Sequence, residues 1–177
     1  MNPAATIQPP PTPAEWAAYY HLRYAVLRQP WQQPPGSERV PADDEAGTIH
    51  ALLLAAGNDG APVALAVGML QPTDHGQGQI RFMAVAPEAA GQGLGRRVVA
   101  YLEAQARAVG MREIVLHSRE AAVGFYEKLG YAVVGPSHLL FGEIQHFLMR
   151  KQLLKFSRPR HKSKHIRKSP SNENHGC

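Results

Sequence analysis

A glycine-rich turn between a strand-like run and a helix-like run restricts the fold of this chain more than any other feature. Glycines stand at positions 91, 93 and 95, after the strand-like run 79–86. Apolar residues at helical spacing follow the turn and predict an amphipathic helix to about Val109. A helix that begins at glycines leaves backbone N–H groups uncovered, and the helix dipole adds positive potential there. Such a turn binds phosphate.

The alternative is an ordinary tight turn followed by a helix with solvated arginines. Arg96 and Arg97 favour phosphate, because both stand in the first turn of the predicted helix. Each cation at that position opposes the helix dipole by about 0.3–1 kcal/mol. An anion bound among them reverses this cost, so we prefer the phosphate-binding interpretation.

Two common phosphate-binding loops do not fit this turn. A P-loop requires Gly-Lys-Ser or Gly-Lys-Thr, and the chain contains neither. A dinucleotide-binding loop requires three spaced glycines, and counting from Gly91 places Arg96 at the third position. The next predicted strand, 114–117, is followed by serine instead of the acidic residue that such a site uses.

Two segments resemble the GCN5-related N-acetyltransferase (GNAT) superfamily. Residues 90–95, Ala-Gly-Gln-Gly-Leu-Gly, resemble its pyrophosphate loop, usually written [QR]-x-x-G-x-[GA]. Residues 124–131, Gly-Phe-Tyr-Glu-Lys-Leu-Gly-Tyr, resemble its FYEKLGF segment, in which a short helix ends at glycine and enters a strand. The resemblance covers 16–151. This sequence departs from the family pattern at Ala90, where Arg or Gln is usual, and at Arg119, where many members have Asn.

The resemblance implies transfer of an acetyl group from acetyl-CoA to a primary amine by direct attack in a ternary complex. Tyr126 is expected to protonate the departing thiolate, since a phenol with a pKa of about 10 matches an alkyl thiolate. The alternative for Tyr126 is an aromatic that only packs. The acceptor is a small-molecule or peptide amine. The resemblance assigns cofactor binding to Met83, Ala84, Val85, Ala90, Gly91, Gln92, Gly93, Leu94, Gly95 and Arg96.

The general base is the least determined residue of the predicted site. Glu143, just before the last predicted strand, is the favoured candidate. Several histidines have suitable pKa values near 6.5, although a lone histidine is more often structural than catalytic. No His, Asp or Glu pair has helical metal-ligand spacing, so we expect no metal. The histidines considered are His50, His75, His117 and His146.

Two further aspects of function stay open. Because Ala90 removes one side-chain contact to phosphate, a non-catalytic acyl-CoA sensor of the same fold is the alternative to an enzyme. The resemblance places the long loop 30–47 at the acceptor site. Its acids, 43–45, mildly favour a cationic amine, although a solvated loop explains them equally well. The oligomeric state, including a homodimer, is also undecided.

The order of the predicted elements favours a mixed α/β (α+β) fold. A first helix begins at the cap Thr12 and stops before Pro30. Hairpins precede β-α-β crossovers, which predicts a mostly antiparallel sheet of six to seven strands flanked by helices, as the resemblance also implies. The predicted strands are 48–56, 63–70, 79–86, 114–117, 131–134 and 144–151.

The composition fits one domain with two unstructured ends. The 177 residues are 44% hydrophobic. We expect a disordered proline-rich arm over 1–11, a GNAT-like domain over 12–153, and a disordered basic tail over 154–177. Residues 1–149 carry 10 Lys and Arg against 13 Asp and Glu, whereas 150–177 carry 9 against 1. The tail has no aromatic after Phe156, which disfavours stacking on nucleic-acid bases.

The sequence also predicts the cellular compartment of the protein. No apolar stretch approaches the ~20 residues that span a bilayer. The first residues lack the basic region and apolar core of a secretory signal. The single cysteine, Cys177, excludes an intrachain disulfide. We therefore expect a cytoplasmic protein without membrane contact.

Overall fold

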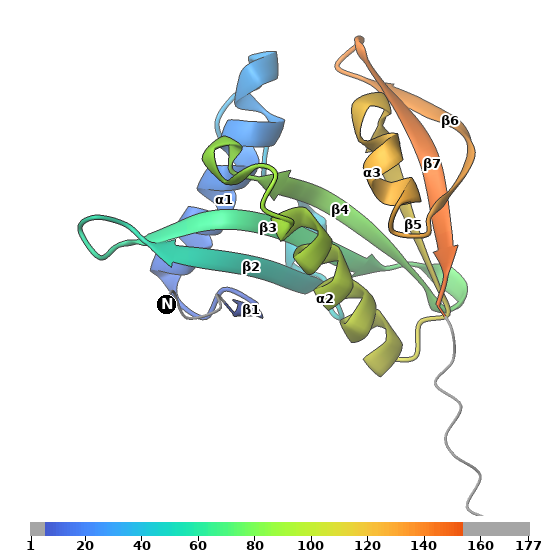
Figure 1. The fold of residues 1–177 in the computed structure, drawn as a ribbon, viewed down its shortest axis with the longest axis horizontal. Coiled ribbons are helices and arrows are strands. Elements are labelled where there is room, and N and C mark those ends of the chain that lie inside the picture. The colour runs from blue at the N-terminus through green and yellow to red at the C-terminus, as the bar shows by residue number, and fades with distance from the viewer. Residues whose placement is uncertain (1–5, 154–177) are drawn as a thin grey trace, which may run out of the picture.

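The alternating apolar runs of the chain form one seven-stranded sheet in a computed structural model, which describes residues 6–153 (Figure 1). The strand order is β1-β2-β3-β4-β5-β7-β6. All neighbours are antiparallel except β4 and β5. This confirms the predicted mixed, mostly antiparallel sheet flanked by helices. The strands are β1 (Ile7–Gln8), β2 (Ile49–Ala56), β3 (Pro62–Pro72), β4 (Gln77–Val85), β5 (Glu113–Arg119), β6 (Ala132–Leu140) and β7 (Ile144–Gln152).

Helices cover both faces of this sheet. Figure 1 shows α1 and α2 on opposite faces of the strands β2 to β4, with α3 beside β5. Within the described residues, no helix has the length and apolar character needed to span a bilayer. The helices are α1 (Pro13–Leu27), α2 (Leu94–Ala108) and α3 (Val123–Glu127), with 3-10 turns η1 (Gln29–Trp31), η2 (Pro41–Asp44), η3 (Asp74–Gly76), η4 (Pro87–Ala89) and η5 (Glu120–Ala122).

Two boundaries differ from the expectation. Residues 7–8 of the expected proline-rich arm form β1 and pair with β2, whereas residues 1–5 and the basic tail 154–177 lie outside the described residues. Strand β6 extends well past the predicted end at Val134, because most of its length pairs with β7. The end of α2 agrees with the prediction, since the helix ends at Ala108 with Val109 as its C-cap, although Val109 is 62% exposed.

The predicted start of α1 is confirmed in atomic detail. The Thr12 hydroxyl accepts a hydrogen bond from the Glu15 amide at 3.3 Å and donates one to the Glu15 carboxylate at 2.6 Å. Helix α1 buries Tyr19, Leu22 and, unexpectedly, Arg23 against the sheet. The end of this helix is thereby fixed over β4, where the candidate site lies.

Strands β4 and β5 separate midway along their length. They pair from Gln77 and Glu113 to Ile80 and Leu116, and no further. Beyond this point β4 stays with β3, while β5 continues beside β7, so the two strands diverge (Figure 1). A β-bulge marks the same place, since the β3–β4 register shifts and Phe82 has φ +53°. A positive φ at a bulky residue is strained backbone.

A buried ion pair lies against this bulge. The Arg23 and Asp43 side chains are 0% and 2% exposed and meet at 2.8 Å. The second Asp43 oxygen accepts a hydrogen bond from the Val40 amide at 2.9 Å, which anchors η2. The Arg23 guanidinium lies 3.8 Å from the centroid of the Phe82 ring. The ion pair therefore connects α1, η2 and the bulge of β4.

We expect Asp43→Asn to lower the free energy of unfolding by about 3–5 kcal/mol, because it leaves the buried guanidinium without a countercharge. Two Arg23 nitrogens, Nε and Nη2, already lack hydrogen-bond partners. The matched control is Asp44→Asn, whose exposed carboxylate should change stability by less than about 0.5 kcal/mol. Urea unfolding measures both, and equal midpoints for the two variants would contradict the assignment.

Candidate active site

The separation of β4 and β5 opens a cavity of about 830 Å³. Both strands line it, together with the end of α1, the glycine-rich turn, α3 and the β6–β7 hairpin. Its lining includes four arginines and three histidines, but no aspartate or glutamate from the described residues. The arginines and histidines of the lining are Arg28, Arg81, Arg96, Arg119, His117, His138 and His146.

The glycine-rich turn has the geometry that its sequence predicted. Gly91 and Gly93 have φ +77° and +75°, and a Cβ added at either would meet nothing within 4 Å. These positions therefore need glycine for backbone conformation and not for space. Gly93 is the N-cap of α2 and provides no side-chain cap, so the first amides of α2 remain uncovered. Gly91 and 93–96 line the cavity, as does Ala90.

The strand before the turn presents an unpaired edge to the same cavity. Met83, Ala84 and Val85 lie beyond the last pairing between β4 and β5, and all three line the cavity. Backbone N–H and C=O groups on such an edge are available for an extended ligand. The predicted cofactor residues are thus brought together, except that Gln92 is exposed and outside the lining.

Tyr126 lies on α3 and lines the cavity, with its side chain almost entirely buried. Its ring makes edge contacts with Phe125 and Tyr131, at centroid distances of 4.9 and 5.8 Å. Burial raises the pKa of the phenol well above its ordinary value, and the nearby charge of Arg119 lowers it only in part. Tyr126 is therefore protonated at neutral pH, and its raised pKa makes it a weaker acid than the thiolate-matched phenol that the sequence led us to expect.

Glu143 occupies a different position from the rest of the predicted site. It lies in the turn between β6 and β7, where its side chain is exposed and its amide donates to the Leu140 carbonyl at 3.2 Å. It is not among the residues that line the cavity. His50, another candidate, is buried beside α1, where its Nε2 lies 3.0 Å from the Asp43 carbonyl oxygen. His75 lies in η3, before β4 begins.

Three histidines converge on the cavity, although the sequence suggested only isolated ones. The Ser137 hydroxyl joins two of them, at 2.6 Å from His117 Nδ1 and 2.9 Å from His138 Nδ1. The rings of His138 and His146 are stacked at 4.6 Å. His146 Nδ1 lies 2.9 Å from the Ile144 carbonyl oxygen, so Nδ1 carries the hydrogen and Nε2 is the free acceptor.

The surroundings keep two of these histidines neutral. Burial lowers the pKa of His146, and the charges of His138 and Arg119 lower it further, against the hydrogen bond to Ile144. Burial likewise lowers the pKa of His117, with contributions from His138, His146 and Arg81. A neutral imidazole with a free Nε2 can accept a proton at physiological pH. His146 therefore has the orientation and charge state of a general base.

The acidic loop does not reach the cavity. Asp43 is committed to the ion pair with Arg23, and Glu45 accepts a hydrogen bond from Gln71 at 2.8 Å. Neither residue lines the cavity, and nor does Asp44. The expectation of a cationic acceptor, which rested on these acids, therefore has no basis in the cavity itself.

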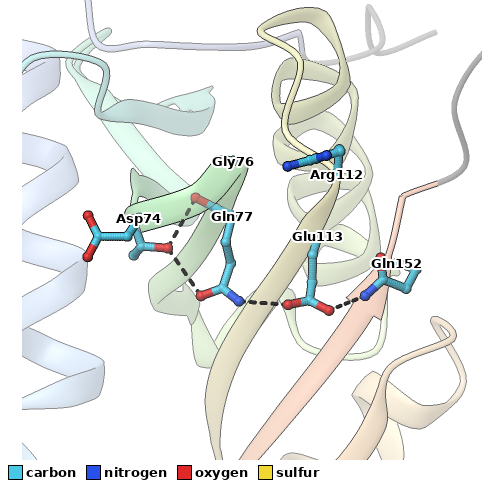
Figure 2. Close-up of a pocket in the computed structure, with 7 residues that line it drawn as sticks. Asp74, Gly76, Gln77, Arg112, Glu113 and Gln152 are labelled. Atoms are coloured by element: carbon cyan, nitrogen blue, oxygen red, sulfur yellow. Dashed lines mark hydrogen bonds between the residues drawn. The ribbon is translucent and has the colours of Figure 1, made fainter.

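A second hollow, of about 530 Å³, lies at the opposite end of β4 and has no comparable chemistry. Figure 2 shows Glu113 between Gln77 and Gln152. These three residues belong to the neighbouring strands β5, β4 and β7, respectively. Gln77 donates to one Glu113 oxygen at 2.6 Å, and Gln152 donates to the other. Because both carboxylate oxygens have partners, this group crosslinks the sheet. No cluster of metal-ligating side chains occurs between residues 6 and 153.

The chain that forms this cleft and glycine-rich turn matches a family model. It belongs to the acetyltransferase (GNAT) family, whose family model matches residues 16–131. A protein of Bacillus subtilis (strain 168) named as an acetyltransferase is 43% identical over 60 residues, which cover 34% of this chain and only 40% of the relative. An uncharacterized acetyltransferase of Streptococcus pyogenes is 27% identical over 122 residues, which cover 69% of this chain and 80% of the relative.

Solved structures show the same fold. A protein of Lactobacillus plantarum assigned as an N-acetyltransferase superposes with a TM-score of 0.72 at 25% identity, covering 86% of this chain and all of that one. An aminoglycoside 6'-N-acetyltransferase crystallised with coenzyme A superposes with a TM-score of 0.66, covering 87% of this chain and 99% of that one. Its 19% identity establishes likeness of fold alone.

Proposed function

We propose that this protein is an N-acyltransferase that moves an acetyl group from acetyl-CoA to a primary amine by direct attack in a ternary complex. One observation carries the proposal. A single cavity contains both an unpaired strand edge, at 83–85, and the uncovered amides of a glycine-started helix, at 93–96. Membership of the family supports the same reaction.

The residues present fit coenzyme A. The amides at the start of α2, with Arg96 beside them, suit the diphosphate. The edge of β4 suits the amide groups of the pantetheine arm. Acetyl-CoA, when bound, supplies the thioester carbonyl that the amine attacks. Ala90 offers no side-chain contact to phosphate, so we assign this role to backbone donors and Arg96.

The proton transfers fall to residues that line the cavity. The acceptor ammonium gives one proton to Nε2 of His146, and the free amine forms the new N–C bond as the C–S bond breaks. The departing thiolate takes the proton of the Tyr126 hydroxyl, and the Tyr126 phenolate then takes the second proton, which the new amide nitrogen must lose. We prefer His146 to Glu143 as the base, because Glu143 is exposed and outside the cavity lining.

A non-catalytic acyl-CoA sensor is the second candidate. Ala90, in place of the usual Arg or Gln, is the observation that favours it. An enzyme and a sensor both bind coenzyme A, but only the enzyme releases free thiol in the presence of amines. A thiol-release assay across an amine panel separates the two.

We expect Gly93→Ala to weaken coenzyme A binding about 5- to 30-fold, since a side chain at positive φ costs about 1–2 kcal/mol in the binding conformation. The matched control is Gly60→Ala in the β2–β3 turn, where φ is +80° and the space is equally open. Isothermal titration should show unchanged affinity for the control. Equal losses in both variants would contradict a specific role for the turn.

Replacing Tyr126 with phenylalanine should lower kcat by about 10²- to 10⁴-fold, the usual range for loss of a proton donor. The ring and its packing are retained, so the Kd for coenzyme A should stay nearly unchanged. Steady-state kinetics and titration on the same preparation measure both quantities. An unchanged kcat would leave Tyr126 as a packing residue.

The pH dependence of kcat identifies the base. Because the base must be neutral and the pKa of His146 is lowered, kcat should be constant at neutral pH and decline at a pH below 6.5. His146→Gln should remove this decline and lower kcat by at least about 10²-fold. Glu143→Gln should change neither. The opposite pattern, in which Glu143→Gln lowers kcat and His146→Gln leaves it unchanged, would identify Glu143 instead.

A further inference from the structure

Three arginines form a cluster in the part of the cavity beside Phe82 and Trp31. Arg28 and Arg81 lie 5.3 and 5.1 Å from the centroid of the Phe82 ring. Arg119 lies 5.5 Å from the centroid of the Trp31 ring. We call Arg28, Arg81 and Arg119 the arginine cluster. Its members come from the end of α1, from β4 and from β5, so the fold brings together charges that are distant in sequence.

No close ion pair within the described residues neutralises the charges of this cluster. Ion pairs within residues 6–153 involve other cations, and no carboxylate lies within 4.0 Å of the three guanidinium groups. Arg28 donates to the Ser37 and Leu27 carbonyls, and Arg81 donates to the Gln71 side-chain oxygen at 2.9 Å, all neutral acceptors. Burial lowers the pKa of both Arg28 and Arg81, and the charge of Arg23 lowers both further. The charge of Glu38 opposes this effect on Arg28, and the charges of Asp43 and Glu45 oppose it on Arg81.

Arg28 and Arg81 lie away from the proposed diphosphate site, whereas Arg119 lies close enough to Tyr126 for its charge to lower the pKa of the phenol. Phe82, beside the cluster, packs against Arg23 of α1, whereas Met83 lies against Gly68 on the face that α2 covers. The glycine-rich turn leads into α2, which is on the opposite face of the sheet from α1 (Figure 1). A diphosphate bound at the start of α2 therefore leaves the cluster free for the second substrate.

A cavity with this charge disfavours a simple ammonium ion. Several positive groups around a cationic amine repel it, and no carboxylate from the described residues lines the cavity to compensate. An amine that also carries an anion can use the planar, bidentate donors of arginine. Such a substrate would neutralise half-buried guanidinium groups while its amino group reaches His146.

We propose that the amine acceptor also carries a carboxylate, and that Arg28, Arg81 and Arg119 bind it. The proposal rests on the proposed acyltransferase function and specifies its second substrate. The substrate class is thus amino acids and related amino carboxylic acids, and not polycationic amines.

Binding of reaction products tests this without requiring turnover. The full chain, saturated with coenzyme A, is titrated with N-acetyl derivatives of the common amino acids, of β-alanine and of 4-aminobutanoate, each paired with its carboxamide. At least one acid should bind 10-fold or more tightly than its amide. If no acid is preferred to its amide, the proposal is overturned.

Charge-matched variants assign the preference to the cluster. Arg119→Gln should reduce the affinity for the preferred acid at least 10-fold and leave the affinity for its amide unchanged. Arg81→Gln should act in the same direction. Arg150→Gln removes the same charge from an exposed position on β7 outside the cavity and should change neither affinity. Equal effects of Arg119→Gln and Arg150→Gln would refute a local carboxylate site.

The two levels of the proposal fail in different ways. If the wild-type protein does not bind coenzyme A, the acyltransferase function is rejected, and the same acid and amide titrations on the free protein still decide the carboxylate site. If coenzyme A binds but amides bind as well as acids, only the carboxylate site is rejected.

Discussion

The candidate site depends on one feature of the sheet, the separation of β4 from β5 beyond Ile80 and Leu116. Unpaired backbone groups inside a sheet cost free energy unless something else satisfies them. Here β5 is held by β7, and the bulge at Phe82 turns β4 away under the buried charge of Arg23. The resulting edge is stable as a structure and available to a ligand. The cavity, the glycine-rich turn and the arginine cluster are all placed by this separation.

The two sides of the cleft offer different kinds of chemistry. Toward α2 the functional groups belong mainly to the backbone, on the edge of β4 and at the helix start after Gly93, with Tyr126 beside them. Elsewhere they are side chains, namely the three arginines of the cluster and three histidines from β5, β6 and β7. A backbone site tolerates side-chain changes such as Ala90, because its donors do not depend on residue identity. A side-chain site can differ between relatives of one fold, and this is where we place substrate selection.

Local patterns predicted the helices, the hairpins and the glycine-rich turn, because each depends on residues close in sequence. The helix start at the glycine-rich turn, without a side-chain cap, and the cap at Thr12 are examples. No local sequence pattern predicts the pairing of β1, the ion pair of Arg23 with Asp43, or the positive φ of Phe82. Each of these features depends on segments that folding brings together. Asp43 misled the interpretation of the acceptor for the same reason. Its sequence neighbours are acidic, but its spatial partner is a buried arginine.

The most direct test of this account is a crystal structure of the full chain grown with saturating acetyl-CoA. The account predicts the diphosphate on the amides of residues 91–96 and the pantetheine arm along β4 at 83–85, with β4 and β5 still apart. A cofactor bound elsewhere, or a complex in which β4 and β5 close the cleft between them, would contradict it.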